Sequence, residues 1–291
     1  VAITADHGLG NAQLGVGPVS AVATGSIGVD STGTATVQAS TISVSDNRQS
    51  ARAVTNTATN SLSLEGAAVD ARGAIQSTQS AQASVSASSS AELFAPVAST
   101  DSSVRFSGNT NTALGVMNDA TNTLEVSAAN IKPAAATGSV SLAETGGPAN
   151  VVATGDQLVS NRQTAATSVT STASTAIYND DRAVAGTAGL SSGAATVSNN
   201  STLAEASANR AANSATVTGD ATQGASVGVS NVQTSSATVS ASATTAAGIT
   251  LAGAVPLNAG SIALNGNTTS ALARGNAATN EIGRASCRER V

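Results

Sequence analysis

One motif recurs four times in this chain and constrains its fold more than any other feature. The motif reads N-x3-A-x4-N-x-A-x-N, and its ungapped copies begin at Asn47, Asn109, Asn200 and Asn267. A degenerate copy begins at Asn161. Repetition of this kind is typical of architectures in which similar units stack on one another and bury a shared core.

The second half of the motif places two asparagines on either side of an alanine, at positions that share one face of a β-strand. A spacing of four residues would also suit a helix, but the surrounding Thr, Ser, Asn and Gly are poor helix formers. The stretches TATVQASTISV and ASVSAS alternate with a period of two, which favours strands. Prolines, which would remove a donor from a strand, fall between the motifs at Pro96, Pro133, Pro148 and Pro256. We therefore predict strands.

The two halves of each motif are out of phase for a single flat strand. Ala51 and Ala53 stand at odd positions, whereas the face from Asn56 to Leu64 uses even positions. A bulge or bend shifts the facing of a strand by one residue. The pattern therefore predicts such an irregularity near Val54–Thr55.

The paired asparagines have a physical role if the strands stack in parallel. Equivalent side chains then lie about 4.8 Å apart, and each amide can donate to the carbonyl of the next. A buried amide is costly alone but is satisfied in such a ladder. We predict buried ladders built from Asn56, Asn60, Asn118, Asn122, Asn209, Asn213, Asn276 and Asn280. The asparagines that open the motifs are predicted to mark turns, because several follow Gly, Asp or Asn.

The spacers fix the expected architecture less tightly than the motifs do. Successive copies start 62, 52, 39 and 67 residues apart, which predicts two or three coils of roughly 20 residues for each motif with its spacer. A weaker unit, QSAQASVSASS, starts at Gln79 and is echoed from Gln233. Aromatic residues are 1% and charged residues 10% of the chain, so its core must consist of small side chains. We predict an all-β, elongated parallel β-solenoid (β-helix) over residues 1–280.

The two ends of the chain need separate treatment. Residue 1 is Val, so we expect the array to belong to a longer protein. The last segment, EIGRASCRERV (281–291), breaks the composition and holds the only cysteine, Cys287. It resembles the translation of a sequencing-adapter oligonucleotide and is expected to be a non-native tail. Residues 284–291 are accordingly predicted to be exposed and irregular.

Little in the sequence supports catalysis. His7 is the single histidine, which excludes multi-histidine metal sites and Ser/His/Asp triads within this chain. The net charge of −5 and the single lysine, Lys132, do not favour a nucleic-acid partner. No apolar run approaches the roughly 18 residues that a membrane span needs. We expect no catalytic residue, no cofactor and no metal.

The N-x-A-x-N cores, with their scattered Gln and Ser, resemble the curlin-type repeats of bacterial amyloid fibres. They are also similar to the Asn/Ala/Ser/Thr repeats of bacterial surface adhesins, including holdfast-anchoring proteins. The paired glutamine ladder and the short regular period of curlins are not seen in the sequence. The resemblance implies attachment at an extracellular, outer-membrane-associated surface or matrix. It also implies a surface polysaccharide or another cell-surface component as partner, with self-association as a further option.

Three alternatives stay open. Rows such as TNTATN and TGTATV could order water or sugar, which would make an ice- or carbohydrate-binding solenoid, and a regular outward T-x-T array would favour it. The pair Asp180/Asp181, with Arg182, resembles the adjacent carboxylates of β-helical polysaccharide hydrolases. A disordered Ser/Thr-rich stalk is the third alternative.

Overall fold

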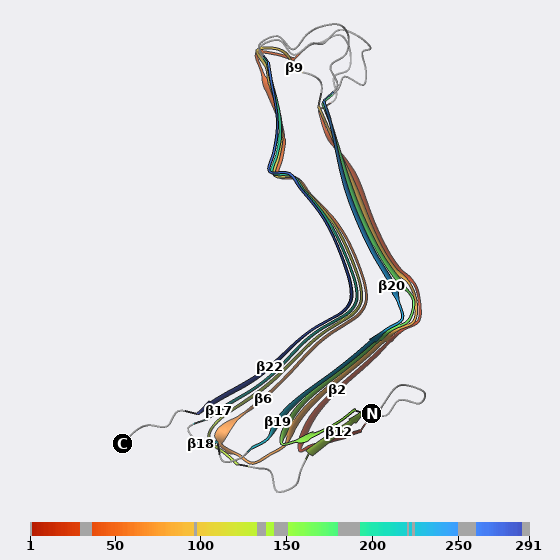
Figure 1. Cartoon of the computed structure of the whole chain (residues 1–291). Helices are drawn as coiled ribbons and strands as arrows, with labels where there is room; N and C mark the ends of the chain where they lie inside the picture. The colour runs from red at the N-terminus through yellow and green to blue at the C-terminus, as the bar shows by residue number, and fades with distance from the viewer. Residues whose placement is uncertain are drawn as a thin grey trace, which may run out of the picture.

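The chain winds into a parallel stack of strands. The structure is a computed structural model that describes residues 2–29, 37–95, 98–132, 138–142, 151–179, 193–219, 221–222, 225–249 and 260–286. All regular elements in these ranges are strands. Four successive turns of chain contribute one strand each to four parallel sheets, and these turns are named coil 1 (7–69), coil 2 (73–131), coil 3 (157–219) and coil 4 (227–286). The predicted parallel β-solenoid is therefore confirmed (Figure 1).

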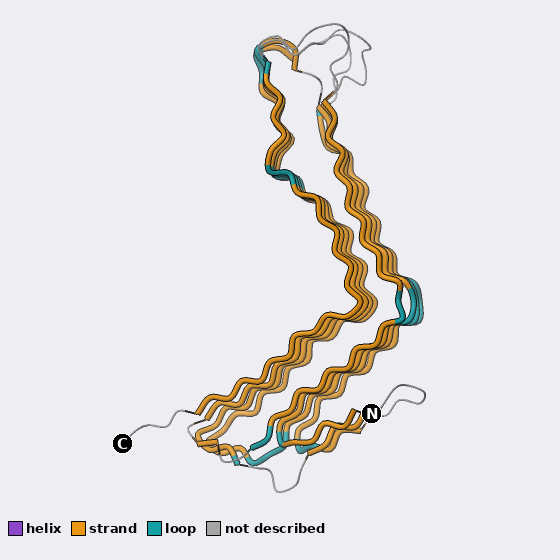
Figure 2. The backbone as a smooth tube through the Cα atoms, viewed as in Figure 1, coloured by secondary structure: helices purple, strands orange, loops and turns teal. Residues whose placement is uncertain are grey.

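Each coil is a flattened loop that runs out along one layer and returns along another (Figure 2). The outgoing layer holds two sheets. The first consists of β2 (His7–Gly15), β7 (Gly73–Ala81), β14 (Gln157–Ala165) and β19 (Val227–Ser235). The second consists of β3 (Val19–Gly28), β8 (Val85–Ala95), β15 (Ser168–Asn179) and β20 (Thr238–Ile249).

The return layer contains the repeated motif. Its short sheet consists of β5 (Thr41–Ser45), β10 (Ser103–Ser107), β16 (Ala194–Ser198) and β21 (Ser261–Asn265). Its long sheet consists of β6 (Arg48–Val69), β11 (Thr110–Ile131), β17 (Ser201–Gly219) and β22 (Thr268–Ser286). The short β18 (Ala221–Thr222) pairs with the end of β11.

Five further elements lie outside this plan or at its margin. The short β4 (Val37–Gln38) pairs in parallel with β9 (Ala98–Thr100). Between coils 2 and 3 the chain forms β12 (Gly138–Leu142) and β13 (Val151–Gly155), which join β1 (Ala2–Thr4) in an antiparallel sheet. This insertion lengthens the connection between coils 2 and 3 without disturbing the parallel register on either side.

Both layers bend at one elbow (Figure 2). In the return layer the bend lies within the long strands, where the pairing skips Thr55, Met117, Ala208 and Gly275. Across this point in β6 the buried positions change from odd to even, as Ala51 and Ala53 give way to Asn56 and Ala58. The predicted irregularity near Val54–Thr55 is confirmed, and it recurs in every coil.

The predicted coil length is wrong. Equivalent asparagines lie 62, 91 and 67 residues apart, and each interval corresponds to a single coil. A flattened coil with long strands keeps every buried side chain between two closely spaced layers, so a core of small residues does not require short coils. Four coils stacked at the usual strand spacing rise only about 14 Å. The described part is therefore longer along its strands than along the stacking direction.

The core fills the space between the layers. Near the elbow it consists mainly of alanine and valine, with the wholly buried Met117 as its largest member. Farther out, Leu93, Phe106 and Ile177 form a second cluster. Ile75, Leu124, Ile131 and Leu158 are buried as completely in other clusters. Fully burying a side chain of this size contributes roughly 1.5–3 kcal/mol, so these large residues add to a core that is rich in alanine.

Candidate functional site: the asparagine and glutamine ladders

The paired asparagines of the motif form two continuous ladders along the stack. In the first ladder, Asn56 Nδ2 donates to Asn118 Oδ1 at 2.7 Å. Asn118 donates in the same way to Asn209 at 2.7 Å, and Asn209 donates to Asn276 at 2.8 Å. The second ladder runs through Asn60, Asn122, Asn213 and Asn280 with donor–acceptor distances of 2.7, 2.7 and 2.8 Å. All eight residues therefore join the predicted ladders, but the predicted burial holds for six of them and not for Asn276 and Asn280.

Each amide of the first ladder also ties the two layers together. The Nδ2 of Asn56 donates to the backbone carbonyl of Ser80 at 2.9 Å, and Asn118 donates to that of Thr164 at 2.9 Å. Both N–H groups of such an amide are therefore used inside the protein. A buried donor left unpaired would cost about 1–3 kcal/mol, so the ladder and the cross-layer bond together make these interior positions suitable for asparagine.

The facing of the motif agrees with the ladder. Asn118, Asn122 and Asn209 are completely buried, and Asn56, Asn60 and Asn213 are nearly so. The alternating positions are half-buried or exposed, namely Thr57, Thr59, Asp119, Thr121, Arg210 and Ala212. On coil 4 the pattern ends, because Asn276 and Asn280 are exposed.

The asparagines that open the motifs do mark turns, but they also form a third ladder. The residue before each has a positive φ, namely Asp46 (59°), Gly108 (68°), Asn199 (55°) and Gly266 (63°). The Nδ2 atoms then donate to the next coil from Asn47 to Asn109 at 2.8 Å, from Asn109 to Asn200 at 2.8 Å and from Asn200 to Asn267 at 2.9 Å. The turn therefore positions the asparagine amide so that it can hydrogen-bond to the equivalent asparagine of the next coil.

A glutamine ladder runs through the opposite layer, and sequence reasoning missed it. Gln79 Nε2 donates to Gln13 Oε1 at 2.8 Å, Gln163 donates to Gln79 at 2.8 Å and Gln233 donates to Gln163 at 2.7 Å. Each glutamine also donates across the interior to a carbonyl of the return layer, as Gln79 does to Asp119 at 3.0 Å. The sequence held one signal for this ladder, because the segment that starts at Gln79 is repeated from Gln233. These two glutamines are the second and fourth members of the ladder.

The degenerate copy at Asn161 does not belong to the motif. Asn161 lies on β14 in the outgoing layer, where it aligns with Ser77 and Asn231 instead of with Asn109 and Asn200. The positions matched to the asparagine pair, Ser171 and Thr175, lie on β15. Asn161 nonetheless joins a polar row of its own, since its Nδ2 donates to Asn231 Oδ1 at 2.7 Å.

The adapter-like tail begins inside the stack. β22 continues to Ser286, and Arg284, Ala285 and Ser286 pair with residues 217–219 of β17. The prediction of an irregular chain from residue 284 is therefore wrong for 284–286. Parallel pairing uses backbone groups, which any residue except proline supplies, so an edge strand can extend through an unrelated sequence. Cys287, Arg288 and Arg290 lie outside the described residues.

Two ion-paired groups lie at or near the surface of the described residues, whereas Asp156 and Arg162 are buried. Arg72 donates to Asp6 through its backbone N, Nε and Nη2 at 2.8, 3.1 and 2.9 Å. These hydrogen bonds from Arg72 hold the pKa of the Asp6 carboxyl well below its ordinary value. On the outer surface of the return layer, Glu205 lies 3.7 Å from Arg210 and 4.0 Å from Arg274.

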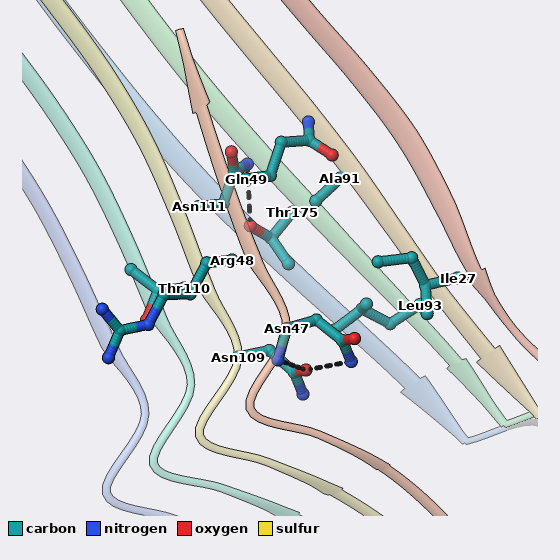
Figure 3. Close-up of a pocket in the computed structure, with 10 residues that line it drawn as sticks. All are labelled: Ile27, Asn47, Arg48, Gln49, Ala91, Leu93, Asn109, Thr110, Asn111 and Thr175. Carbon is teal, nitrogen blue, oxygen red and sulfur yellow. Dashed lines mark hydrogen bonds between the residues drawn. The ribbon is translucent and has the colours of Figure 1, made fainter.

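The interior offers little room for a ligand. Figure 3 shows a recess between the layers where Asn47, Gln49 and Asn111 lie near Leu93 and Thr175. Its volume of about 10 Å³ suits about one water molecule, whereas ligand pockets usually measure 300–1,000 Å³. Among the described residues no group of three or more His, Cys, Asp or Glu could hold a metal ion. The carboxylates Asp180 and Asp181, with Arg182, lie outside the described residues.

One outer face carries a regular array of hydroxyl groups. It belongs to the sheet β3-β8-β15-β20, where three outward columns run across the four coils. The columns are Ser20, Ser86, Thr170 and Ser240; Val22, Ser88, Thr172 and Ser242; and Thr24, Ser90, Ser174 and Thr244, and every member except Val22 carries a hydroxyl group. Toward the tip of the sheet, Phe94 and Tyr178 lie side by side on this same face, between Gly28 and Gly248.

The outward rows expected from the sequence are less regular. Thr57 and Thr59 of the stretch TNTATN do face outward. In the neighbouring coils the position of Thr57 is taken by Asp119, Arg210 and Ala277, which interrupt any T-x-T array. Most of the stretch TGTATV lies outside the described residues.

The fold and the ladders together define the class of the protein: a parallel β-solenoid whose coils are joined by rows of hydrogen-bonded amides. No family model, curated protein or solved structure matches the chain. In the part of the chain that the structure describes, no helix is long and apolar enough to cross a membrane.

Proposed function

We propose that the protein is a non-catalytic structural and adhesive repeat protein of a bacterial surface or extracellular matrix. The observation that carries the proposal is the continuity of the ladders, which join all four coils in both layers. Amide rows and parallel pairing that run through every coil produce a stiff, uniform body with large outer faces. Such a body suits attachment over a surface better than it suits turnover of a small substrate.

The partner that we propose is a surface polysaccharide. The outer faces are rich in hydroxyl and amide groups, and the charged residues among them are few. Neutral polar surfaces of this kind exchange hydrogen bonds with sugars without the strong salt dependence of ionic contacts. The proposed location is therefore outside the cell, at the outer membrane or in the matrix.

A second candidate function, carbohydrate or ice binding by one flat face, has its own supporting observation. The hydroxyl columns on the sheet β3-β8-β15-β20 repeat about every 4.8 Å across the strands and about every 6.8 Å along them. Phe94 and Tyr178 are register partners farther along the same face, beyond the row that contains Glu92, and Tyr178 combines apolar ring area with a polar hydroxyl. This face would also be the first place to look for the polysaccharide contact of an adhesin.

Retention of the purified chain on immobilised polysaccharide tests the proposed function. Bacterial extracellular polysaccharide should retain the folded chain and should release no new reducing ends over time. The double variant Ser88→Asp/Thr172→Asp should lose retention if the hydroxyl face makes the contact, and Thr57→Asp on the other layer is its matched control. No retention of the folded chain, or progressive release of reducing ends, would contradict an adhesive, non-catalytic function.

A further inference from the structure

The outer face of the return layer is concave, because this layer lies on the inner side of the elbow (Figure 2). A recess of about 310 Å³ occupies the bend and is named the elbow groove. That volume reaches the range of ordinary ligand pockets, roughly 300–1,000 Å³. Outward residues of coils 2, 3 and 4 line the groove, and all of them precede the adapter-like tail. Among them are Asp119, Thr121, Arg210, Ala212, Arg274 and Thr279.

The groove lies on a basic part of an acidic chain. The long strands run from their first residues to the register column of Thr59, just past the elbow, with six charged residues at outward positions. These residues are Arg48, Arg52, Arg210, Arg274, Asp119 and Glu205. The local charge is therefore +2, whereas the whole chain carries −5. Farther along the same strands Glu65 and Glu125 make the outward face acidic, so the local field attracts an anionic ligand to the elbow.

Two arginines line the groove from opposite sides of the elbow. Arg274 precedes Gly275 of coil 4, and Arg210 follows Ala208 of coil 3. Glu205 lies 3.7 Å from the Nη1 atom of Arg210 and 4.0 Å from that of Arg274. The side chains of the two arginines are 36% and 45% exposed. A charge-assisted hydrogen bond measures about 2.7–2.9 Å, so the contacts with Glu205 leave guanidinium N–H groups available to a ligand.

The polar groups of the groove select the chemistry of that ligand. A guanidinium group binds a carboxylate through two parallel N–H donors. Glu205 and Asp119 accept hydrogen bonds from hydroxyl groups, but they repel a densely charged chain of phosphates. Sugar acids carry carboxylate and hydroxyl groups together, and they therefore match both kinds of side chain.

A nucleic acid fits this face less well. Single strands bind proteins largely by stacking their bases on aromatic side chains. The chain has three aromatic residues, and none lies on the outer face of the long sheet. Phe106 is buried in the core, and Phe94 and Tyr178 lie on the outgoing layer. The elbow groove therefore favours an acidic sugar over a nucleic acid.

We propose that the elbow groove binds an acidic polysaccharide, with Arg210 and Arg274 holding its carboxylate groups and with Glu205 and Asp119 accepting from its hydroxyl groups. The inference rests on the proposed polysaccharide-binding function. It adds the acidic class of the sugar and a second binding face, on the opposite layer from the hydroxyl columns.

Two forms of one polymer test the class of sugar. Polygalacturonate and its fully methyl-esterified form share a backbone and differ in the charge of the carboxyl group. The full chain should bind polygalacturonate about tenfold more tightly than the ester at about 50 mM salt, and the difference should shrink at about 500 mM salt, because exposed charge pairs are screened. Equilibrium titration with each polymer would measure both affinities.

Variants at the groove test the site. Arg210→Gln/Arg274→Gln should lose the preference for polygalacturonate, because glutamine is polar but uncharged. The matched control is Arg288→Gln/Arg290→Gln, which makes the same change in net charge within the adapter-like tail and should bind as the parent does. Glu205→Gln should tighten the binding of polygalacturonate about threefold, because it removes the carboxylate that competes for both arginines. A variant that only disturbed the fold would not bind more tightly.

Three results would overturn the proposal. They are equal affinity of the parent for the two polymers, an equal loss of preference in the tail control, and tighter binding of single-stranded DNA than of polygalacturonate. The ester reports separately on the proposed function, because its binding needs no carboxylate. A folded chain that binds neither polymer contradicts both proposals, whereas one that binds both polymers equally contradicts only the acidic-sugar groove.

Discussion

Coils 2 and 3 carry the same ladders as coils 1 and 4, but in different surroundings. Asn118 and Asn209 are completely buried, whereas Asn276, which accepts an equally short hydrogen bond at 2.8 Å, is exposed. A ladder contact alone therefore does not remove an amide from water. Asn56 of coil 1 is also buried, so the exposed end of the ladders is the one at coil 4. One substitution should consequently have a large effect in an inner coil and a small one in coil 4.

The largest effect is expected from charging the inner ladder. Asn118→Asp with Asn122→Asp places two carboxylates between layers, beside amides that can no longer complete their bonds. Breaking a buried polar pair in this way costs at least about 3 kcal/mol, which urea unfolding would measure. Asn276→Asp with Asn280→Asp is the matched end-coil control and should cost less than about 1 kcal/mol, because water still reaches the charges. Equal losses would contradict the difference between inner and end coils.

The pH dependence of the inner variant sharpens this prediction. Burial raises the pKa of the introduced carboxyls above their unfolded values. The folded state then binds more protons than the unfolded state, so the penalty is full at neutral pH and shrinks as pH falls through the raised pKa. Urea midpoints of variant and parent should converge between pH 7 and pH 4. A penalty independent of pH would mean that the carboxylates reach solvent.

A second comparison uses the glutamine ladder. Gln163→Ala leaves the partners of its amide without their bonds, namely Gln79, Gln233 and the carbonyl of Arg210. The expected loss is about 2–3 kcal/mol of unfolding free energy. Gln233→Ala on coil 4 should lose about half as much, since that residue is only half-buried and bonds to a single ladder neighbour. A larger loss at Gln233 would be inconsistent with the account.

A third comparison concerns the turn that precedes the opening asparagine. Gly108 has a φ of +68°, and a Cβ there would meet the side chain of Asp46. Gly108→Ala should therefore cost about 1–3 kcal/mol. Gly275, at the elbow of coil 4, has no atom close to where a Cβ would be, so Gly275→Ala should change stability by less than about 0.5 kcal/mol. Thermal unfolding midpoints would show whether the two substitutions separate.

The smallest effect is expected at the surface pair Asp6–Arg72, whose members directly precede coils 1 and 2. The hydrogen bonds from Arg72 lower the pKa of Asp6 in the folded state, so its contribution is present above the unfolded pKa and is lost as pH falls through the folded one. Asp6→Asn should lower the unfolding midpoint slightly at pH 7, and this difference should shrink as pH falls below the ordinary pKa range of a carboxyl. A deficit that persists unchanged at the lowest pH would show that the contact is not ionic.

The asparagine ladders could be predicted because their residues keep one spacing in all four coils. The pair around Ala58 repeats without a gap, so stacked copies necessarily align. The phase change near Val54–Thr55 was visible for the same reason, because alanines and asparagines occupy positions of opposite parity. Repeated local spacing reports directly on which side chains share a face.

Coil length and the glutamine ladder could not be predicted, because they depend on register between segments without repeated spacing. The residues around Gln13 differ in sequence from those around Gln163. The two glutamines are related only because both align with Gln79 in the stacked strands. The opposite error occurred at Asn161. Its sequence resembles the motif, but it lies on β14 in the outgoing layer, whereas the true copies lie in the return layer. At the tail, the unusual composition of residues 281–291 predicted an irregular chain, yet Arg284 pairs with Val217. Backbone pairing is nearly independent of the side chain, so composition could not predict it.

Disulfide formation between outward positions tests the central claim, which is the parallel register of one coil on the next. Thr121 and Ala212 are register partners in β11 and β17, 91 residues apart in sequence, and their expected Cα separation of about 4.8 Å permits a disulfide. With Cys287 replaced by serine, Thr121→Cys/Ala212→Cys should cross-link almost completely under mild oxidation, as mass spectrometry would show. The pair Thr123→Cys/Ala212→Cys, shifted by two residues, should cross-link poorly. Equal cross-linking of both pairs, or none of the first, would contradict the stacked register.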